Sequence, residues 1–370
     1  MKIFVTGTRG IPDIPGGVER HCEQLYPLIA ESGVEVAVAT RKPYVTRPMP
    51  QWEKIRLAHL FAPRKKSFEA IVHTFLAVCK ARVSNADIVH IHGVGPWLMV
   101  PFARLLGLKV VATNHGPDYD RQKWGRTARM MLRLGEYLGG RFAHSVIVIS
   151  ETVGEIVRRR CDCEPVLIPN GVKIPEKSKA TDYLERIGVR SSGYILAVSR
   201  LVPEKGLDLL IDAFEEIDSH VKLVIAGDAD HQTEYSRKIK ARIAANPDIV
   251  STGYITGEPL RQVYSHARLF VLPSYHEGLP IALLEALSFD LPVVVSDIPA
   301  HWEIGLNAER YFAAGDAQDL KEKIQYHLTH EMPLAERQAL RTMLRQRYDW
   351  SQIAARTAAV YRSVLDHREP

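Results

Sequence analysis

Short apolar runs alternate with longer amphipathic stretches along most of the chain. Apolar runs of about four to eight residues between turn residues are typical of buried strands, and the longer stretches repeat at helical spacing. In the first half, this pattern predicts strands at 2–6, 36–40, 88–91, 109–113 and 146–149. Strands that alternate with helices favour a parallel sheet covered on both faces, which is a doubly wound α/β domain.

A second series of the same kind opens at Tyr194. Its strands are predicted at 194–199, 221–226, 250–254, 269–272 and 293–296. Residues 173–192 are polar and charged, so we interpret them as a linker that holds one short helix. We therefore expect two Rossmann-like domains, residues 1–172 and 173–349, facing each other across a cleft.

The last segment shows helical spacing of its apolar residues from Trp350 to Leu365. Ile353, Val360 and Val364 recur on one face, as in an amphipathic helix. Such a helix can close the second domain or cross back to the first. We expect residues 350–370 to pack on the N-terminal domain.

Composition adds few constraints. A net charge of +5 and an isoelectric point near 8.9 are too mildly basic to indicate nucleic acid, but they suit an anionic substrate or an acidic membrane surface. The four cysteines form no Cys-x-x-Cys pair, so reduced thiols are expected. The chain starts without signal-peptide features and has no apolar run of membrane-spanning length, which predicts a cytoplasmic protein.

One stretch, residues 274–287, combines a helix start with two glutamates. Pro280 suits the first helical position because its missing N–H would be unsatisfied there anyway. The free N–H groups from Gly278 onward then form an anion site between Glu277 and Glu285. Carboxylates beside a phosphate site make sense if the ligand also carries hydroxyls, as a nucleotide sugar does. Alternatively, both are ordinary carboxylates favoured by the helix dipole.

A glycine-rich loop follows the first predicted strand and leads into a helix. In this arrangement the backbone N–H groups of Gly16 and Gly17 can approach a phosphate closely. Gly7 and Gly10 lack the dinucleotide spacing, and Arg41 stands where an NAD site requires an acid. The other interpretation is a plain connection with turn glycines.

Further polar residues follow predicted strands. His115 lies between an apolar strand and a glycine, which favours a ligand contact over a space-filling histidine. Arg200 and Lys205 border a loop before a helix and fit a diphosphate, unless they are surface charge beside Glu204. Glu285 is expected to be buried in its helix, so it is a poor partner for Glu277 in direct glycoside hydrolysis.

Metal ligation is weakly indicated. The Asp-x-Asp triplets Asp118–Asp120 and Asp228–Asp230 are candidate cation ligands. So short a pattern arises easily by chance, and no histidines cluster at metal-ligand spacing. We therefore expect protein cations and helix dipoles, and no metal, to stabilise a leaving phosphate.

Two basic segments carry interleaved apolar residues. The first runs from Arg64 through Phe68 and Phe75 to Arg82, and the second covers residues 121–134. Each is either a solvated helix face or a basic amphipathic helix that rests on anionic lipid.

Four of these features occur in one order: Gly16-Gly17 with Glu19, Asn114-His115-Gly116, Arg200 with Lys205-Gly206, and Glu277 seven residues before Glu285. In this combination the chain resembles the retaining glycosyltransferases of family 4, which have the GT-B fold, over nearly its whole length. The first fifty residues and the run from Asp118 to Trp124 resemble a bacterial subgroup that builds cell-surface polysaccharides, often on a polyprenyl-diphosphate carrier.

The resemblance implies a role for each matching residue. The catalytic residues would be His115, at the donor sugar, with Glu277, Arg200 and Lys205, and no protein nucleophile. The donor-binding residues would be Gly16, Gly17, Arg200, Lys205, Tyr254, Glu277, Gly278, Leu279 and Glu285. Of these, Arg200 and Lys205 would hold the diphosphate, Glu285 the ribose, and the main chain around Tyr254 the base. The acceptor-binding residues would be Asp118, Arg121 and Lys123.

Two positions depart from the family's pattern. Asp290 stands where a glycine usually follows the helix of Glu285, and we expect this change to affect only the turn. The sequence Pro299-Ala-His301 replaces a loop that is commonly rich in glycine, so the contact of this loop with the ligand is left open.

We therefore predict a retaining, metal-independent hexosyl- or deoxyhexosyltransferase that uses a UDP- or GDP-sugar. Its acceptor would be a glycan or a polyprenyl-diphosphate-linked sugar in bacterial surface polysaccharide biosynthesis. We expect no cofactor, no nucleic-acid partner, and peripheral contact with the inner face of the cytoplasmic membrane. The alternatives are a nucleotide-sugar 2-epimerase and an inactive nucleotide-sugar-binding protein.

Overall fold

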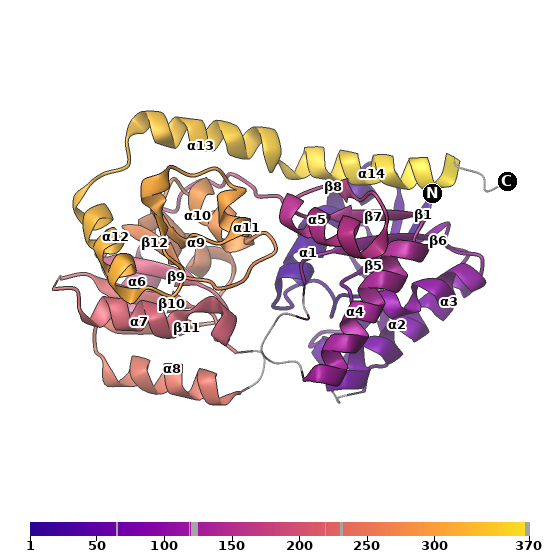
Figure 1. Ribbon diagram of the computed structural model, residues 1–370, viewed down its shortest axis with the longest axis horizontal. Helices are drawn as coiled ribbons and strands as arrows, with labels where there is room; N and C mark the ends of the chain where they lie inside the picture. Colours follow the sequence, from indigo (N-terminus) through magenta and orange to yellow (C-terminus); the bar gives the residue numbers. More distant parts are fainter. Residues whose placement is uncertain (64–65, 118, 120–124, 219, 230–231, 367–370) are drawn as a thin grey trace. The chain divides into compact units, whose positions relative to one another are not determined.

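The computed structural model describes residues 1–63, 66–117, 119, 125–218, 220–229 and 232–366 (Figure 1). The chain forms two compact units. The first comprises Met1–Gly171 and the chain from Tyr348 onward, and the second comprises Val172–Arg347. Among the described residues, no helix combines the length and the apolar character that crossing a bilayer requires.

The first unit is built on a sheet of strand order β3-β4-β2-β1-β5-β6-β7-β8, in which β3 pairs antiparallel with β4 and the other pairs are parallel. Its strands are β1 (Lys2–Thr6), β2 (Glu35–Arg41), β3 (Gln51–Trp52), β4 (Ile55–Leu60), β5 (Ile88–His92), β6 (Lys109–Asn114), β7 (Ser145–Val148) and β8 (Val166–Leu167). Its α-helices are α1 (Gly17–Glu31), α2 (Lys66–Val83), α3 (Val100–Leu105), α4 (Arg126–Phe142), α5 (Glu151–Cys161) and α14 (Trp350–Asp366).

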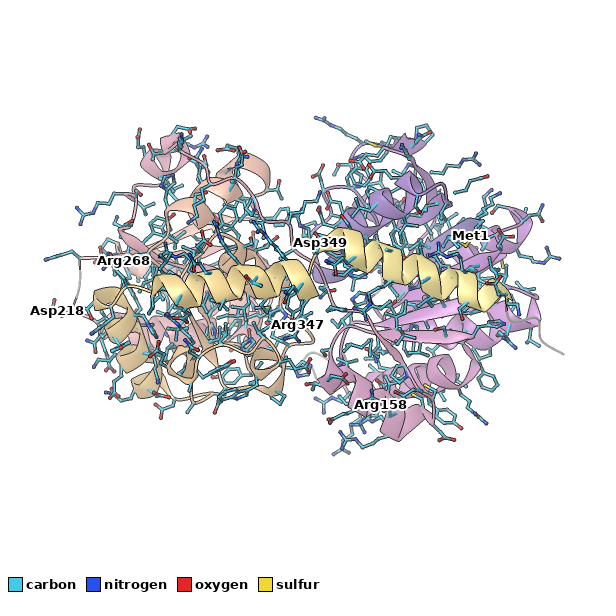
Figure 2. The ribbon with its side chains drawn as sticks, turned by 90° about the horizontal axis from the view of Figure 1, so that it is seen from above. Met1, Arg158, Asp218, Arg268, Arg347 and Asp349 are labelled. Carbon is cyan, nitrogen blue, oxygen red and sulfur yellow. The ribbon has the colours of Figure 1, made fainter. Side chains whose placement is uncertain are left out.

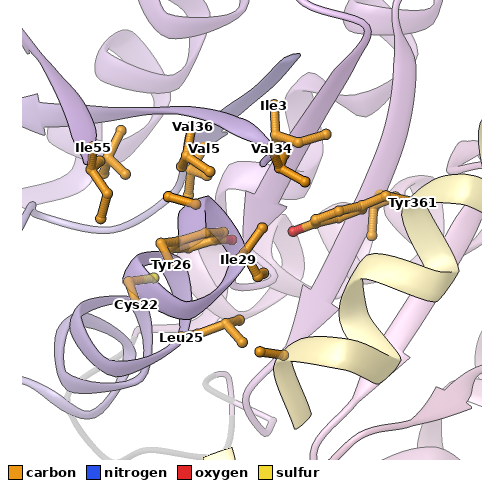
Figure 3. Close-up of a cluster of buried hydrophobic side chains, with 14 of the residues drawn as sticks. Ile3, Val5, Cys22, Leu25, Tyr26, Ile29, Val34, Val36, Ile55 and Tyr361 are labelled. Carbon is orange, nitrogen blue, oxygen red and sulfur yellow. The ribbon is translucent and has the colours of Figure 1, made fainter. Parts of the chain in front are cut away.

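Alternate residues of the strands enter two cores on opposite faces of this sheet. Val89 and Ile91 of β5 pack with α2 and α5, whereas Ile88 joins the core formed with α1 and α14. Figure 3 shows this second core, where Tyr361 of α14 faces side chains of α1. Removing each large aliphatic side chain from water stabilises the unit by about 1.5–3 kcal/mol.

The second unit contains a parallel sheet of order β11-β10-β9-β12-β13-β14. Its strands are β9 (Tyr194–Val198), β10 (Lys222–Ala226), β11 (Ile249–Gly253), β12 (Leu269–Leu272), β13 (Val293–Ser296) and β14 (Tyr311–Phe312). Its α-helices are α6 (Asp182–Arg186), α7 (Leu207–Glu215), α8 (Glu234–Ala245), α9 (Gly257–His266), α10 (Ile281–Ser288), α11 (Pro299–Trp302), α12 (Ala317–Thr329) and α13 (Leu334–Arg347).

The doubly wound α/β class is thus confirmed, and each predicted strand is found to within about one residue at its ends. Strand β4 was not predicted, although Ile55 and Leu57 alternate with Arg56 as in a half-buried strand. The final helix lies in the first unit, where it runs from beside Asp349 towards Met1 (Figure 2).

The short helix expected within residues 173–192 is found as α6, but the interpretation of the segment as a linker is wrong, because it is packed into the second unit. The backbone N–H of Ser178 donates to Ser265 Oγ at 2.8 Å, and that of Tyr183 donates to Gln262 Oε1 at 3.0 Å. Leu184 is fully buried. Charged residues on one side of the segment had masked the few apolar residues that anchor it.

The turn after α10 also does more than the sequence suggested. Asp290 has a φ of +57°, the left-handed conformation that glycine usually supplies after a helix. Its carboxylate accepts hydrogen bonds from Arg341 at 2.5 and 2.7 Å, and Lys177 Nζ lies 3.2 Å away. Asp290 therefore fastens α13 and the segment before α6 to this turn, a role that glycine cannot fill.

Candidate functional site

In the second unit, Lys205 and Glu277 meet beyond the carboxyl ends of the neighbouring strands β9 and β12. Lys205 Nζ donates to Glu277 Oε1, and Ser274 Oγ donates to the same oxygen at 2.8 Å. Burial alone would raise the pKa of Glu277, but the attraction of Lys205, with the hydrogen bonds from Lys205 and Ser274, outweighs it and lowers the pKa. At neutral pH the pair is therefore a mostly buried carboxylate with its own cation.

Gly206 leaves room for the loop that carries Lys205, after β9, to approach the loop that carries Glu277, after β12. Its φ is +61°, and a Cβ atom at this position would lie 2.2 Å from the carbonyl oxygen of Pro273. Only glycine adopts this conformation without strain and leaves room for the neighbouring backbone. The residue after Lys205 is thus required for the packing that brings Lys205 to Glu277.

His301, which sequence reasoning did not select, belongs to the same cluster. The imidazole is fully buried, and its Nδ1–H donates to the carbonyl oxygen of Ser296 at 2.8 Å. Within the part of the chain that the structure describes, Nε2 has no hydrogen-bond partner. Burial lowers the pKa of His301 to about 4, against the attraction of Glu277, so the ring is neutral at pH 7. The departure from a glycine-rich loop at this position was the available signal.

The other predicted donor-site residues in this unit are distributed around the same edge of the sheet. Helix α10 begins at Ile281 and not at Pro280, which precedes it in extended conformation. Glu285 is half-buried and not buried as expected, and it accepts a hydrogen bond from the Tyr264 hydroxyl at 3.2 Å. The remaining positions are half-buried Arg200 and Gly278, buried Leu279, and half-exposed Tyr254 directly after β11.

In the first unit, the glycine-rich loop is organised around Glu19. The Glu19 carboxylate accepts hydrogen bonds from the backbone N–H of Arg9 at 2.9 Å and from Thr8 Oγ1 at 3.3 Å. A Cβ atom at Gly16, whose φ is +145°, would lie 1.9 Å from Glu19 Oε2. Gly17 begins α1 and faces open space. The backbone conformation therefore favours glycine at position 16, whereas Gly17 leaves the start of the helix accessible.

His115 lies in a cluster of imidazoles that the sequence did not reveal. His21 of α1, His92 of β5 and His115 after β6 each offer a ring nitrogen, and these nitrogens lie within 4.8 Å of one another. These histidines are far apart in the sequence, so their spacing gave no sign of the cluster that the fold forms. His92 Nδ1 lies 2.9 Å from His115 Nε2, and His21 Nδ1 lies 2.9 Å from Asn170 Oδ1.

Burial governs the charge of this cluster. It lowers the pKa of His21 and of His115 to about 3 and that of His92 well below its usual value, with repulsion among the rings acting in the same direction. The three rings are therefore neutral at pH 7.

The predicted acceptor-binding residues Asp118, Arg121 and Lys123 lie outside the described residues, as do Asp120 and Asp230 of the two Asp-x-Asp triplets. Asp228 is described, and its carboxylate is 2.7 Å from Lys240 Nζ. Lys240 is therefore already the counter-charge of the Asp228 carboxylate.

The second basic segment overlaps the start of helix α4, which has one tightly packed face and one exposed face. Glycines form the packed face: a Cβ atom at Gly135 would lie 2.2 Å from the carbonyl oxygen of Val94, and one at Gly139 would lie 2.3 Å from the Trp97 ring. The exposed face consists of Arg126, Arg129, Met130, Met131, Arg133, Leu134 and Tyr137. This basic and apolar surface is compatible with an anionic lipid surface.

Comparison with known proteins places these features in a family context. The family model for Glycosyltransferase Family 4 matches residues 15–175, and that for Glycosyl transferases group 1 matches residues 188–346. An uncharacterized glycosyltransferase of Methanocaldococcus jannaschii is 27% identical over 333 residues, which cover 82% of this chain and 82% of that protein. The chain is a glycosyltransferase with the GT-B fold.

Two further matches concern glycosyltransferases and their ligands. The UDP-Gal:alpha-D-GlcNAc-diphosphoundecaprenol alpha-1,3-galactosyltransferase of Escherichia coli is 27% identical over 227 residues, which cover 57% of this chain and 58% of that enzyme. The crystal structure of Anabaena HepE in complex with UDP-glucose superposes with a TM-score of 0.79 at 19% identity, covering 98% of this chain and 99% of that one.

Proposed function

We propose that this glycosyltransferase transfers a hexosyl or deoxyhexosyl group from a UDP- or GDP-sugar with retention of anomeric configuration and without a metal. The acceptor that we propose is a glycan or a polyprenyl-diphosphate-linked sugar in bacterial surface polysaccharide biosynthesis. The mostly buried Lys205–Glu277 pair carries the proposal, because it combines a cation for phosphate with a carboxylate for sugar hydroxyls.

The chemistry assigned to the pair follows from charge. When the bond between the anomeric carbon and the diphosphate breaks, negative charge develops on the leaving oxygen. Lys205, with Arg200 on the same loop, would neutralise that charge, which is the task a divalent cation performs in metal-dependent transferases. Glu277 would then exchange its bond to Lys205 for a hydroxyl of the donor sugar.

Features of the relatives support the choice of ligands. The Escherichia coli relative is named for a UDP-sugar donor and a diphosphoundecaprenol acceptor, and Anabaena HepE binds UDP-glucose. A lipid-linked acceptor agrees with the exposed face of α4, for which we propose peripheral contact with the inner face of the cytoplasmic membrane. For the acceptor itself we propose contacts with Asp118, Arg121 and Lys123.

Calorimetric titration with UDP, GDP and NADP, in buffer containing EDTA, followed by turnover assays with matching sugars, tests the proposal. Binding of UDP or GDP in EDTA and transfer to an added polyprenyl-diphosphate sugar are expected. A requirement for divalent metal, or a preference for NADP, would contradict the proposal. Turnover without acceptor would indicate the 2-epimerase, and binding without any turnover would indicate an inactive binding protein.

A further inference from the structure

The buried face of α4 carries a single ionisable side chain, Glu136. The other buried residues of this helix are Gly135, Gly139 and Gly140. Glu136 itself is fully buried. Removing a carboxylate from water is costly unless hydrogen bonds and an opposite charge compensate it. The partners of Glu136 therefore show which segments this carboxylate holds.

The two carboxylate oxygens of Glu136 face different elements. Oε2 accepts a hydrogen bond from Arg160 Nη1 of α5 at 3.2 Å, which joins α4 to α5. Oε1 accepts one from Asn114 Nδ2, at the end of β6, at 3.1 Å and one from the Tyr119 hydroxyl at 3.3 Å. Asn114 and Tyr119 are buried as well. One oxygen thus binds the neighbouring helix, and the other binds the chain that leaves β6.

Groups that have only one hydrogen-bonding role fix the direction of these bonds. The backbone N–H of Gly116 can only donate, and it lies 2.8 Å from Asn114 Oδ1. The Asn114 amide must therefore present its oxygen to Gly116 and its NH₂ group to Glu136. This NH₂ group and the guanidinium of Arg160 also only donate, so each oxygen of Glu136 is an acceptor.

Asn114 and Gly116 are the two chain neighbours of His115. Gly116 has a φ of +121°, a backbone conformation that glycine adopts without strain. The hydrogen bond from its N–H closes a turn across His115, and Glu136 holds the Asn114 side chain that closes this turn. The backbone of His115 is thus fixed on both sides by an amide that Glu136 orients.

Tyr119 connects the same carboxylate to the acceptor side. The Tyr119 side chain is buried, and the Cζ atom of Arg160 lies 4.6 Å from the centre of its ring, as in a cation–π contact. Its hydroxyl donates to Glu136. Tyr119 directly follows Asp118, for which we propose an acceptor contact. One carboxylate therefore binds the residue before His115 and the residue after Asp118.

We propose that Glu136 is a positioning residue for glycosyl transfer, which places His115 through Asn114 and the acceptor-side segment through Tyr119. The inference rests on the proposed function, because these positions affect transfer only if His115 meets the donor and the segment of Tyr119 meets the acceptor. A carboxylate that only joined α4 to α5 would need the arginine alone. Here the second oxygen bonds twice to the chain after β6.

Two reciprocal substitutions test the link between Glu136 and Asn114. Glu136→Gln can no longer accept from both Asn114 and Arg160, because one of its two terminal atoms is now a donor. Asn114→Asp sets two carboxylates against each other. In the double variant, the introduced glutamine can donate to the introduced aspartate, which restores the contact. Recovery in the double variant is therefore the signature of a direct link.

Gln262→Glu is the matched control. The buried Gln262 amide likewise accepts from a backbone N–H, that of Tyr183 at 3.0 Å, and donates to a carboxylate, Asp182 Oδ1, at 2.9 Å. These residues lie in the second unit. The control thus undergoes the same chemical change as Asn114→Asp, but away from His115, and it reports the effect of a purely structural loss.

The first measurement needs no substrate. Amide hydrogen exchange of Gly116, followed by NMR of the ²H,¹⁵N-labelled full-length protein, reports on the turn across His115. We expect slow exchange in wild type, exchange faster by about tenfold or more in each single variant, and recovery in the double variant. Gln262→Glu should leave the rate unchanged.

Three results of this measurement would overturn the inference: fast exchange of Gly116 in wild type, unchanged rates in both single variants, or no recovery in the double variant. The wild-type protein alone decides the first. The test therefore stands even where a variant fails to fold.

The second measurement is transfer by the same variants under conditions in which urea unfolding shows each of them folded. We expect kcat to fall about tenfold or more in each single variant and to recover in the double variant, while UDP or GDP affinity stays within about twofold of wild type. A purely structural loss, as in Gln262→Glu, would lower the free energy of unfolding without lowering kcat.

Unchanged kcat in the folded single variants would overturn the positioning role, as would an equal fall of kcat in Gln262→Glu. Absence of transfer in wild type would instead contradict the proposed function. The exchange of Gly116 involves no donor or acceptor, so failure of the link and failure of the proposed glycosyl transfer are distinguishable.

Discussion

Lys205 and Glu277 stand 72 positions apart in the chain, and their side chains form an ion pair with 16% and 10% exposure. In a pair buried to this extent, each charge is compensated mainly by the other. A ligand that draws the lysine away must therefore also provide a partner for the carboxylate. In the proposed reaction, the diphosphate of the donor binds Lys205 and the hydroxyls of its sugar bind Glu277. This relationship gives the first prediction.

Lys205→Ala should weaken UDP or GDP binding about 10- to 100-fold and nucleoside binding far less, because the lost charge-assisted hydrogen bonds involve the phosphates. Calorimetry with nucleoside and nucleoside diphosphate measures both. Lys321→Ala, which removes a surface partner of Glu216, is the matched control. The double variant Lys205→Ala, Glu277→Gln separates two effects on diphosphate affinity. One is the loss of the cation, and the other is the negative charge of Glu277, which has no counter-charge in the single variant. Full recovery of diphosphate affinity in this variant would contradict the role of Lys205.

Gly206→Ala should destabilise the second unit by more than Gly188→Ala does. Both glycines have a left-handed backbone, with φ of +61° and +70°, so both substitutions incur strain of about 1–2 kcal/mol. Only at Gly206 does the new Cβ also meet a backbone oxygen, at 2.2 Å, whereas Gly188 faces open space. Urea unfolding of the two variants measures both losses of unfolding free energy. Equal losses would show that the contact with the backbone oxygen does not contribute.

Acid should destabilise the first unit before its carboxylates titrate. Burial lowers the pKa of His21, His90 and His115 to about 3, whereas in the unfolded chain histidine has a pKa of about 6.5. Between these values the unfolded chain binds more protons, so the free energy of unfolding falls as pH is lowered, by about 1.4 kcal/mol per pH unit and histidine. Urea unfolding at pH 7.5 and at about pH 5.5 measures the loss, and His90→Gln should reduce it. Stability that stays constant over this interval would contradict the assigned neutral state.

Met130→Ser with Leu134→Ser should weaken binding to anionic phospholipid vesicles about tenfold or more, because two exposed apolar side chains no longer enter the interface. Added salt should weaken wild-type binding too, since exposed Arg126, Arg129 and Arg133 flank these positions. Vesicle co-sedimentation measures both effects. Leu334→Ser, which removes an exposed leucine in the second unit, is the control. Binding that is unaffected by the α4 substitutions would exclude this face as the contact.

Hydrophobic periodicity alone located β1, β2, β5, β6, β7, β9 to β13 and the last helix, because a buried parallel strand needs a continuous apolar run whatever its neighbours are. It failed where a few residues anchor a polar segment, as Leu184 does, and where a strand is short or half-buried, as β4 is. The chemistry of Lys205, Glu277 and His115 was also readable, since each follows an apolar strand.

Only the tertiary structure decided which of these groups touch. The sheet order sets β9 beside β12 and thereby joins Lys205 to Glu277, and Gly206 matters because of an oxygen of Pro273. Tyr26, His90 and Tyr361 meet because α14 belongs to the first unit and packs with α1 on the same face of its sheet. Periodicity reports which way a side chain points relative to its own strand or helix. Its partners and pKa depend on burial by residues far along the chain, which no local pattern contains.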